Sequence, residues 1–232
     1  MAEHFQRELK KLKQQIFALG GLVEEHFRKG TLALIEGDAI LAQTVIDEDL
    51  FIDDKEVEIE EACLKILALH QPVAGDLRYI VAVLKINSDL ERIGDLAASI
   101  SFRAKLFQAE QEPGFVLPVS LHKMAEVTQR MLQRSLDALI NYDSDLARIV
   151  LADDDLVDLF NREIFDYVRE RLVAGSQHAP QLIHLLTVAR AIERAADHIT
   201  NIAEDIIYML EGEIVRHKKE QQTPDSTSPP PN

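Results

Sequence analysis

Apolar side chains recur every three or four positions through the first hundred residues, which is the spacing of one face of an α-helix. Between residues 3 and 36 this face consists of Phe5, Leu9, Leu12, Ile16, Leu19, Val23 and Phe27. The pattern predicts three helices, at residues 3–36, about 38–70 and about 76–111. Asp38 is the predicted N-cap of the second helix, and the QPVAGD sequence predicts a turn before the third. The EPGFVLP sequence at residues 112–118 then interrupts the pattern.

The sequence repeats itself after this interruption. Residues 33–49 align with residues 138–154 at an offset of 105, and residues 90–100 align with residues 192–202 at an offset of 102. The offset falls by three because the second copy is three residues shorter between these segments. The missing residues fall in a turn, where a structural repeat tolerates gaps. We therefore predict an all-α fold, a tandem duplication of a three-helix bundle with six helices in total. The predicted units are residues 1–112, residues 113–217 and a disordered, polar and Pro-rich tail at residues 218–232.

Composition narrows the class of protein. The 40 acidic and 25 basic residues leave a net charge of −15, which phosphate backbones and anionic lipids would repel, so no nucleic-acid partner is expected. Cys63 is the only cysteine, which excludes an intramolecular disulfide and a cysteine-based zinc site. The first residues lack a signal-peptide core, and no apolar run approaches the roughly 20 residues of a transmembrane helix. We predict a cytoplasmic protein.

Acidic residues lie on the apolar side of the second predicted helix. Because residues three and four apart share a helix face, one narrow stripe contains Asp49, Asp53, Glu56 and Glu60. The apolar residues on its two sides are Ile52, Ile59 and Cys63, and Leu50, Val57 and Leu64. The solvent side of the helix is marked by Asp54, Lys55 and Glu58. These four carboxylates therefore lie within the apolar wedge of the helix and not opposite to it.

A second acidic pair lies on the third predicted helix. Glu91 and Asp95 are stacked one turn apart in line with apolar residues, whereas the basic residues that point elsewhere are Lys85, Arg92 and Arg103. The equivalent positions of the second half are Asp154, Asp158, Glu193, Asp197 and, one turn further along, Asn201. The match is incomplete, because Asn161 and Phe165 stand where the first half has glutamates.

Partly buried carboxylates that face each other need protons, basic side chains or metal ions to neutralise them. Few basic residues are aligned with these acids, and Arg190 in the second half is the clearest. Hard oxygen ligands from adjacent helices suit Fe, Mn, Mg or Ca, and sometimes Zn. We predict a metal site in each half. In the alternative interpretation, the acids lie solvated at the rim of each bundle as ordinary surface pairs.

Together with the QPVAGDLR turn, these acidic motifs resemble those of the PhoU family. Proteins of this family are accessory regulators of bacterial phosphate uptake. The motifs that carry the resemblance are Asp49-x-x-Ile-Asp53, Glu91-Arg-Ile-Gly-Asp95, Asp154-x-x-Val-Asp158 and Glu193-Arg-Ala-Ala-Asp197-His-Ile-Thr-Asn201. The resemblance extends over about residues 3–216 and implies two three-helix bundles, a homodimer and a metal site on each bundle. Ser99 departs from the pattern, because the second half has Asn201 there, and we expect the first site to differ in metal number or affinity.

The same resemblance implies a function. The protein would negatively regulate the phosphate-starvation two-component response and phosphate uptake. It would do so by linking a phosphate ABC transporter, through its ATPase, to a sensor histidine kinase.

Two other functions stay open from the sequence. Ferritin-like di-iron storage proteins and oxidases also line helical bundles with carboxylates, but none of the eight histidines follows a Glu at the spacing of their Glu-x-x-His motif. His198 turns away from Asp197 on a helix and is predicted to be a surface or inter-helix residue. A metal-free adaptor could dock basic partner segments on the acidic rows. No G-x-S-x-G elbow or phosphate-binding loop is present, so we predict no enzyme.

The QPVAGDLR turn has two interpretations. In the first, Pro72 stops one helix and Asp76 caps the next. In the second, Asp76 and Arg78 form an exposed contact with a partner protein.

Overall fold

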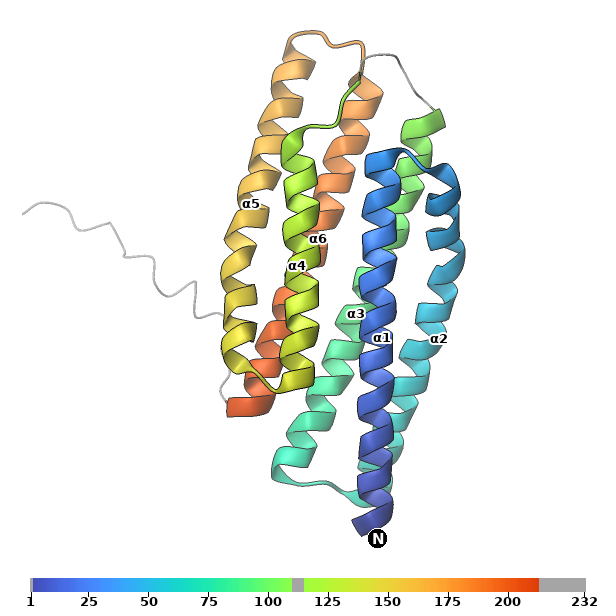
Figure 1. Cartoon of the computed structure of the whole chain (residues 1–232), viewed down its shortest axis with the longest axis vertical. Helices are drawn as coiled ribbons and strands as arrows, with labels where there is room; N and C mark the ends of the chain where they lie inside the picture. Colours follow the sequence, from blue (N-terminus) through green and yellow to red (C-terminus); the bar gives the residue numbers. More distant parts are fainter. Residues whose placement is uncertain (1, 110–114, 213–232) are drawn as a thin grey trace, which may run out of the picture.

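The computed structural model of the chain describes residues 2–109 and 115–212, which form six α-helices and no strand (Figure 1). The helices are α1 (Ala2–Glu36), α2 (Ala39–His70), α3 (Ala74–Ala109), α4 (Val119–Asn141), α5 (Ser144–Val173) and α6 (Ala179–Glu211). The predicted all-α fold with six helices is therefore confirmed. The predicted boundary at residues 112 and 113 and the predicted tail at residues 218–232 lie outside the described residues.

Each half of the chain forms a bundle of three helices, and the two bundles lie side by side (Figure 1). The helices α1, α2 and α3 pack on one another, and so do α4, α5 and α6. The bundles meet where α3 packs against α6 and α1 against α4, so α2 and α5 lie at opposite outer edges of the molecule. No helix in the described part of the chain is both long and apolar enough to cross a membrane.

The turns before α2 and α5 show the duplication at the level of single hydrogen bonds. The Asp38 side chain accepts hydrogen bonds from the backbone N–H groups of Ile40 and Leu41, both at 2.9 Å, as the predicted N-cap should. Asp143 occupies the equivalent position and accepts from the N–H of Leu146 at 2.9 Å. Both halves thus start their second helix with the same capping interaction.

The start of α3 differs from the prediction. Gln71 and Ala74 both adopt left-handed backbone conformations, with φ of 46° and 49°, so the chain reverses within three residues and α3 begins at Ala74. Asp76 therefore lies in the first turn of α3, and the prediction that it caps the helix is wrong. Its charge still favours the helix, because the N-terminal end of a helix carries partial positive charge.

Close packing of α1 on α3 depends on a glycine. A Cβ atom on Gly30 would lie 2.9 Å from the carbonyl oxygen of Ala97 and 3.0 Å from Oγ of Ser101, which is too close for an ordinary contact. This approach brings the largest apolar residues of α1 and α3 into one core, including Ile16, Phe27, Ile86, Leu90, Ile93 and Ile100. The apolar side chains of α1 therefore pack in the same core as those of α3.

Charged side chains cross the interface between the two bundles. Lys85 on α3 donates to Asp205 on α6 over 3.1 Å, and the Asp205 side chain is only 2% exposed. Nearby, Oδ1 of Asp89 lies 2.8 Å from Nδ1 of His198, and Asn201 donates to the same oxygen at 3.4 Å. His198 thus lies between helices, as predicted. Because a buried charge is destabilising without its partner, these contacts favour one register of α3 on α6.

We expect Gly30→Ala to lower the free energy of unfolding by about 1–3 kcal/mol, because the added methyl group overpacks the α1–α3 contact. Gly21→Ala is the matched control, since a Cβ atom there meets nothing within 4 Å. It is expected to stabilise the helix by about 0.5–1 kcal/mol. Denaturant unfolding followed by circular dichroism measures both, and equal effects of the two substitutions would contradict this account of the packing.

Candidate metal centre

Three of the predicted acids converge where α2 packs on α3. Asp53 comes from α2, and Glu91 and Asp95 come from α3. One carboxylate oxygen of each lies within 4.8 Å of the other two, and all three residues are partly buried. Asp49 lies one turn before Asp53 on α2 and is close enough to raise its pKa. The structure therefore brings together residues that are up to 46 positions apart in the predicted first site (Asp49 to Asp95).

Local packing holds α2 close to α3 at this point. Ile52 is buried beside Asp53, so the helix face that carries the acids is turned towards α3. Gly94 lies between the two acids of α3, and a Cβ atom there would be 3.2 Å from the Ile52 side chain and 3.7 Å from Oδ1 of Asp49. Because Gly94 lacks a side chain, the carboxylates of the two helices can approach one another.

The acids of the first site, Asp49, Asp53, Glu91 and Asp95, form what we call the first row. This row carries more negative charge than the neighbouring basic side chains neutralise. Burial raises the pKa of Asp53, and the charges of Asp49 and Asp95 raise it further. Burial likewise raises the pKa of Glu91, followed by the charge of Asp95. Arg92 opposes this rise, because its guanidinium lies 3.3 Å from Glu91 and 3.2 Å from Asp95. The prediction that Arg92 points elsewhere is wrong, since the long side chain reaches back to both acids.

The last two acids of the predicted stripe on α2, Glu56 and Glu60, do not join the group formed by Asp53, Glu91 and Asp95. Asn87 on α3 donates to the backbone carbonyl oxygen of Glu56 at 2.9 Å and to its Oε1 at 3.2 Å. Burial raises the pKa of Glu56, followed by the charge of Glu60. Glu60 itself is exposed. Glu56 is therefore held by an amide, while Glu60 faces solvent.

The equivalent acids of the second half are more open. Asp154 and Glu193 are partly buried, but Asp158 and Asp197 are exposed. Within residues 2–109 and 115–212, the acids of this half form no group of three whose oxygens all lie within 4.8 Å. They still interact, because partial desolvation raises the pKa of Glu193, followed by the charge of Asp197, and raises the pKa of Asp197, followed by the charge of Asp158.

Substituted residues account for part of this difference between the halves. Arg190 opposes the rise in the pKa of Glu193, as expected from its position in the sequence. Arg190 and Glu193 line a pocket of about 500 Å³ together with Asn161 and Phe165. This pocket lies beside the second row, the acids Asp154, Asp158, Glu193 and Asp197 of the second half. The amide nitrogen of Asn201, a predicted ligand, donates to Asp89 across the interface between the bundles. The second row therefore has a basic residue beside it, and it has Asn161, Phe165 and open space where the first half has Glu56 and Glu60.

Both halves of the chain match the same family. The PhoU domain matches residues 16–104 and again residues 121–206. The chain belongs to the PhoU family. The two matches coincide with the two copies inferred from the internal repeat, and the predicted resemblance is confirmed.

Relatives of known sequence and structure agree with this assignment. The chain is 38% identical over 223 residues to the PhoU homolog of Pseudomonas aeruginosa, covering 94% of this chain and 89% of that protein. It is 35% identical over 214 residues to PhoU of Escherichia coli, covering 92% and 88% respectively, and both relatives are named phosphate-specific transport system accessory proteins. The crystal structure of PhoU from Pseudomonas aeruginosa matches with a TM-score of 0.83 at 37% identity, over 90% of this chain and 100% of that one. As a PhoU accessory protein the chain is not an enzyme, in agreement with the prediction.

Sequence reasoning missed a cluster that lies outside the PhoU acid rows. The carboxylate of Glu8 lies 2.7 Å from Nε2 of His70, 3.0 Å from Nζ of Lys65 and 3.7 Å from Nε2 of His4. Hydrogen bonds from Lys65 and His70 lower the pKa of Glu8 to about 2, so its carboxylate stays ionised and already has hydrogen-bond donors beside it. We interpret this cluster as a clasp between α1 and α2. Only the four-residue spacing of His4 and Glu8 could have suggested it, because His70 is 62 residues from Glu8.

The two predicted partner-contact residues of the PhoU turn sequence differ in exposure. Asp76 is exposed, whereas Arg78 is partly buried. A Cβ atom on Gly212, at the end of α6, would lie 3.5 Å from Nη1 of Arg78. Arg78 therefore packs against the second bundle, and a substitution there would disturb the contact between the halves. Asp76 is the better probe of a partner contact.

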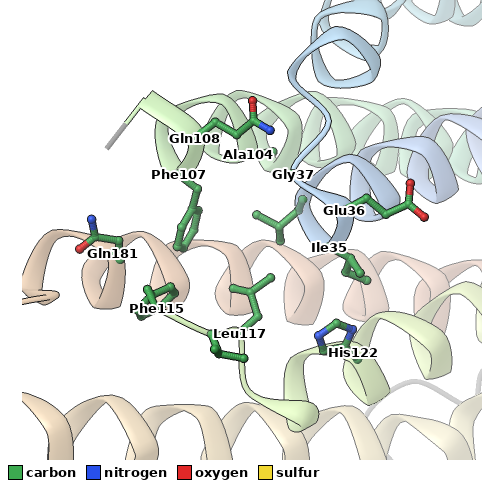
Figure 2. A pocket seen from close by; sticks show the side chains of 12 residues that line it. Ile35, Glu36, Gly37, Ala104, Phe107, Gln108, Phe115, Leu117, His122 and Gln181 are labelled. Carbon is green, nitrogen blue, oxygen red and sulfur yellow. The ribbon is translucent and has the colours of Figure 1, made fainter. Parts of the chain in front are cut away.

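A pocket of about 400 Å³ lies between the two PhoU repeats, near the turn that joins α1 and α2 (Figure 2). Phe107, Phe115 and Leu117 gather on one side of it, and the rings of Phe107 and Phe115 lie 5.8 Å apart. Glu36 and His122 are polar residues of its lining. None of the predicted metal ligands lines this pocket, so it is separate from both acid rows.

Neutralising one acid of the first row is expected to stabilise the metal-free protein. We expect Glu91→Gln to raise the melting temperature at neutral pH by about 2–4 °C, the shift that about 1 kcal/mol produces in a protein of this size. In the wild type, protonation of Glu91 at lower pH removes the same negative charge. This protonation stabilises the folded protein because the pKa of Glu91 is raised in the fold. The difference should therefore shrink as the pH falls through that raised pKa towards 4.5.

Differential scanning calorimetry without metal measures this effect. Glu61→Gln is the control, because Glu61 is exposed on the same helix as Asp53, and we expect little change. A lower melting temperature for Glu91→Gln at neutral pH would show that the row is already neutralised.

Proposed function

We propose that this PhoU family member is a cytoplasmic regulator of phosphate homeostasis that acts through protein contacts. It restrains the phosphate-starvation two-component response and phosphate uptake by linking a phosphate ABC transporter, through its ATPase, to a sensor histidine kinase. It works as a homodimer and binds no nucleic acid. The observation that carries the proposal is the match to the PhoU family over both halves, together with relatives named as accessory proteins of phosphate transport.

In this proposal the first row of acids holds a metal ion. Asp53, Glu91 and Asp95 would supply oxygen ligands from two helices, and Asp49 would extend the site by one turn. The residues fit a cation because burial and neighbouring negative charges raise the pKa values of Asp53 and Glu91, and because Oδ1 of Asp49 is buried without a hydrogen-bond partner in the described part of the chain. Such oxygen donors suit Fe, Mn, Mg, Ca or Zn. A bound ion would fix α2 against α3 and so rigidify one outer edge of the molecule.

The second row, formed by Asp154, Asp158, Glu193 and Asp197, would together with Asn201 hold a cation more weakly. Its acids are more exposed, and Arg190 already reduces the repulsion at Glu193. We expect the two halves to differ in metal affinity, with the first half the tighter.

One observation favours a metal-free adaptor as the second candidate. Leu50, Val57 and Leu64 are 72%, 49% and 54% exposed on α2, beside the acid row. Exposed apolar residues next to carboxylates would suit a basic amphipathic helix of a partner protein. In that case the acids would attract the partner directly, and their function would not depend on metal.

Complementation of a strain that lacks this gene tests the function. We expect a phosphate-starvation reporter to be active in phosphate-rich medium in that strain, and the wild-type gene to switch it off. The double substitution Glu91→Gln, Asp95→Asn should lose most of this repression and lower metal affinity at least tenfold. Glu58→Gln is the control, because Glu58 is exposed and its pair with Lys55 at 2.7 Å is a weak surface contact.

Each result separates the candidates. A reporter that stays off in the deletion strain would contradict the regulatory function. Repression by a wild-type protein that contains no metal after purification without chelator would favour the metal-free adaptor. Loss of repression together with loss of metal in the double variant would support the metal-dependent regulator.

A further inference from the structure

One ring nitrogen of a buried histidine of α1 has no hydrogen-bond partner in the described part of the chain. The His26 side chain is 3% exposed, and its Nε2 atom makes no hydrogen bond within the described part of the chain. The polar atom that it faces is Oδ1 of Asp49, 3.5 Å away, which is likewise buried and without a hydrogen bond. Two buried polar atoms therefore point at each other from α1 and α2, at the end of the first acid row.

Such a pair is destabilising unless something satisfies both atoms. Buried polar groups in proteins are nearly always hydrogen-bonded, and a carboxylate is more costly to leave unpaired than a neutral group. The separation of 3.5 Å is longer than an N–H···O bond. It is close to the distance of about 3.4 Å between two ligand atoms that each lie about 2.1 Å from one tetrahedral ion. The geometry thus suits two ligands of a common ion.

We infer that His26 supplies a nitrogen ligand to the first metal centre, and that the ion it shares with Asp49 is a transition metal. The inference rests on the proposed metal site and adds a third helix to it. The row of acids joins α2 to α3, and His26 ties both to α1. An ion bound there would hold all three helices of the first bundle.

A nitrogen ligand also defines which ions the centre prefers. Imidazole suits Zn²⁺, Fe²⁺ and Co²⁺, whereas Ca²⁺ and Mg²⁺ take oxygen ligands almost exclusively. At the same offset of 105 residues, the second half has Met131, which is fully buried. A thioether is a poor ligand for these divalent ions, so the second half lacks the nitrogen donor. The preference for transition metals therefore belongs to the first half alone.

X-ray absorption of the full-length protein with one equivalent of Zn²⁺ tests the inference. The His4→Gln, His70→Gln variant serves as the background, because it removes both imidazoles of the clasp of His4, Glu8 and His70. We expect imidazole scattering in this background and its loss on adding His26→Gln. Zn²⁺ affinity, measured by competition with a chromophoric chelator, should fall about 10–100-fold, while Ca²⁺ affinity stays unchanged.

His122→Gln is the matched control, because His122 lines the pocket of Figure 2 and not the acid row. We expect it to keep both the scattering and the affinity. Imidazole scattering that persists in His26→Gln, or equal Zn²⁺ affinity, would overturn the role of His26. If His26→Gln does not fold, the absence of imidazole scattering in the background protein overturns it instead.

Failure of the underlying proposal is a different result. If one equivalent of Zn²⁺ does not bind even to the wild type, the proposed metal site fails and the inference fails with it. If the Glu91→Gln, Asp95→Asn variant loses Zn²⁺ but His26→Gln does not, the metal site stands and only the role of His26 is rejected.

Discussion

The packing of α2 on α3 in the first bundle holds carboxylates close together without enough positive charge beside them. Asp53, Glu91 and Asp95 are brought together because buried apolar neighbours turn both helix faces inwards and Gly94 removes the side chain that would separate them. Arg92 supplies one positive charge from the solvent side, yet the pKa values of Asp53 and Glu91 stay raised. A multivalent cation would remove this repulsion and would at the same time join the helices that carry the acids.

The duplicated fold uses this arrangement twice, with different results. Both repeats keep the capping aspartate before their second helix and the acidic pair on their third. The second repeat has Arg190 where the first has Ser88, it has Asn161 and Phe165 beside a pocket where the first has Glu56 and Glu60, and it has Met131 where the first has His26. The charge that a cation must balance is therefore smaller there. Under the proposed function, the first repeat would therefore hold a metal ion more tightly than the second.

Local features of this structure were predictable from sequence, whereas contacts between distant helices were not. Helical periodicity gave the helices, and the Asp38 cap and the acidic pairs followed from spacing within one helix. The start of α3 was misjudged because two residues other than glycine adopt positive φ. The paths of long side chains, such as that of Arg92, depend on rotamers that spacing does not determine. His26 and His70 were missed because each meets its acid across helices, and a single sequence holds no signal for such a pair.

The central claim is that the acids of the first bundle, with His26, converge on a cation. Anomalous diffraction from crystals grown with Zn²⁺ tests it most directly, because it locates the ion without assuming its ligands. We predict a strong anomalous peak bounded by Asp49, Asp53, Glu91 and Asp95, with Nε2 of His26 at about 2.0–2.1 Å from an ion. A structure in which these side chains turn into solvent and no peak lies among them would contradict the account.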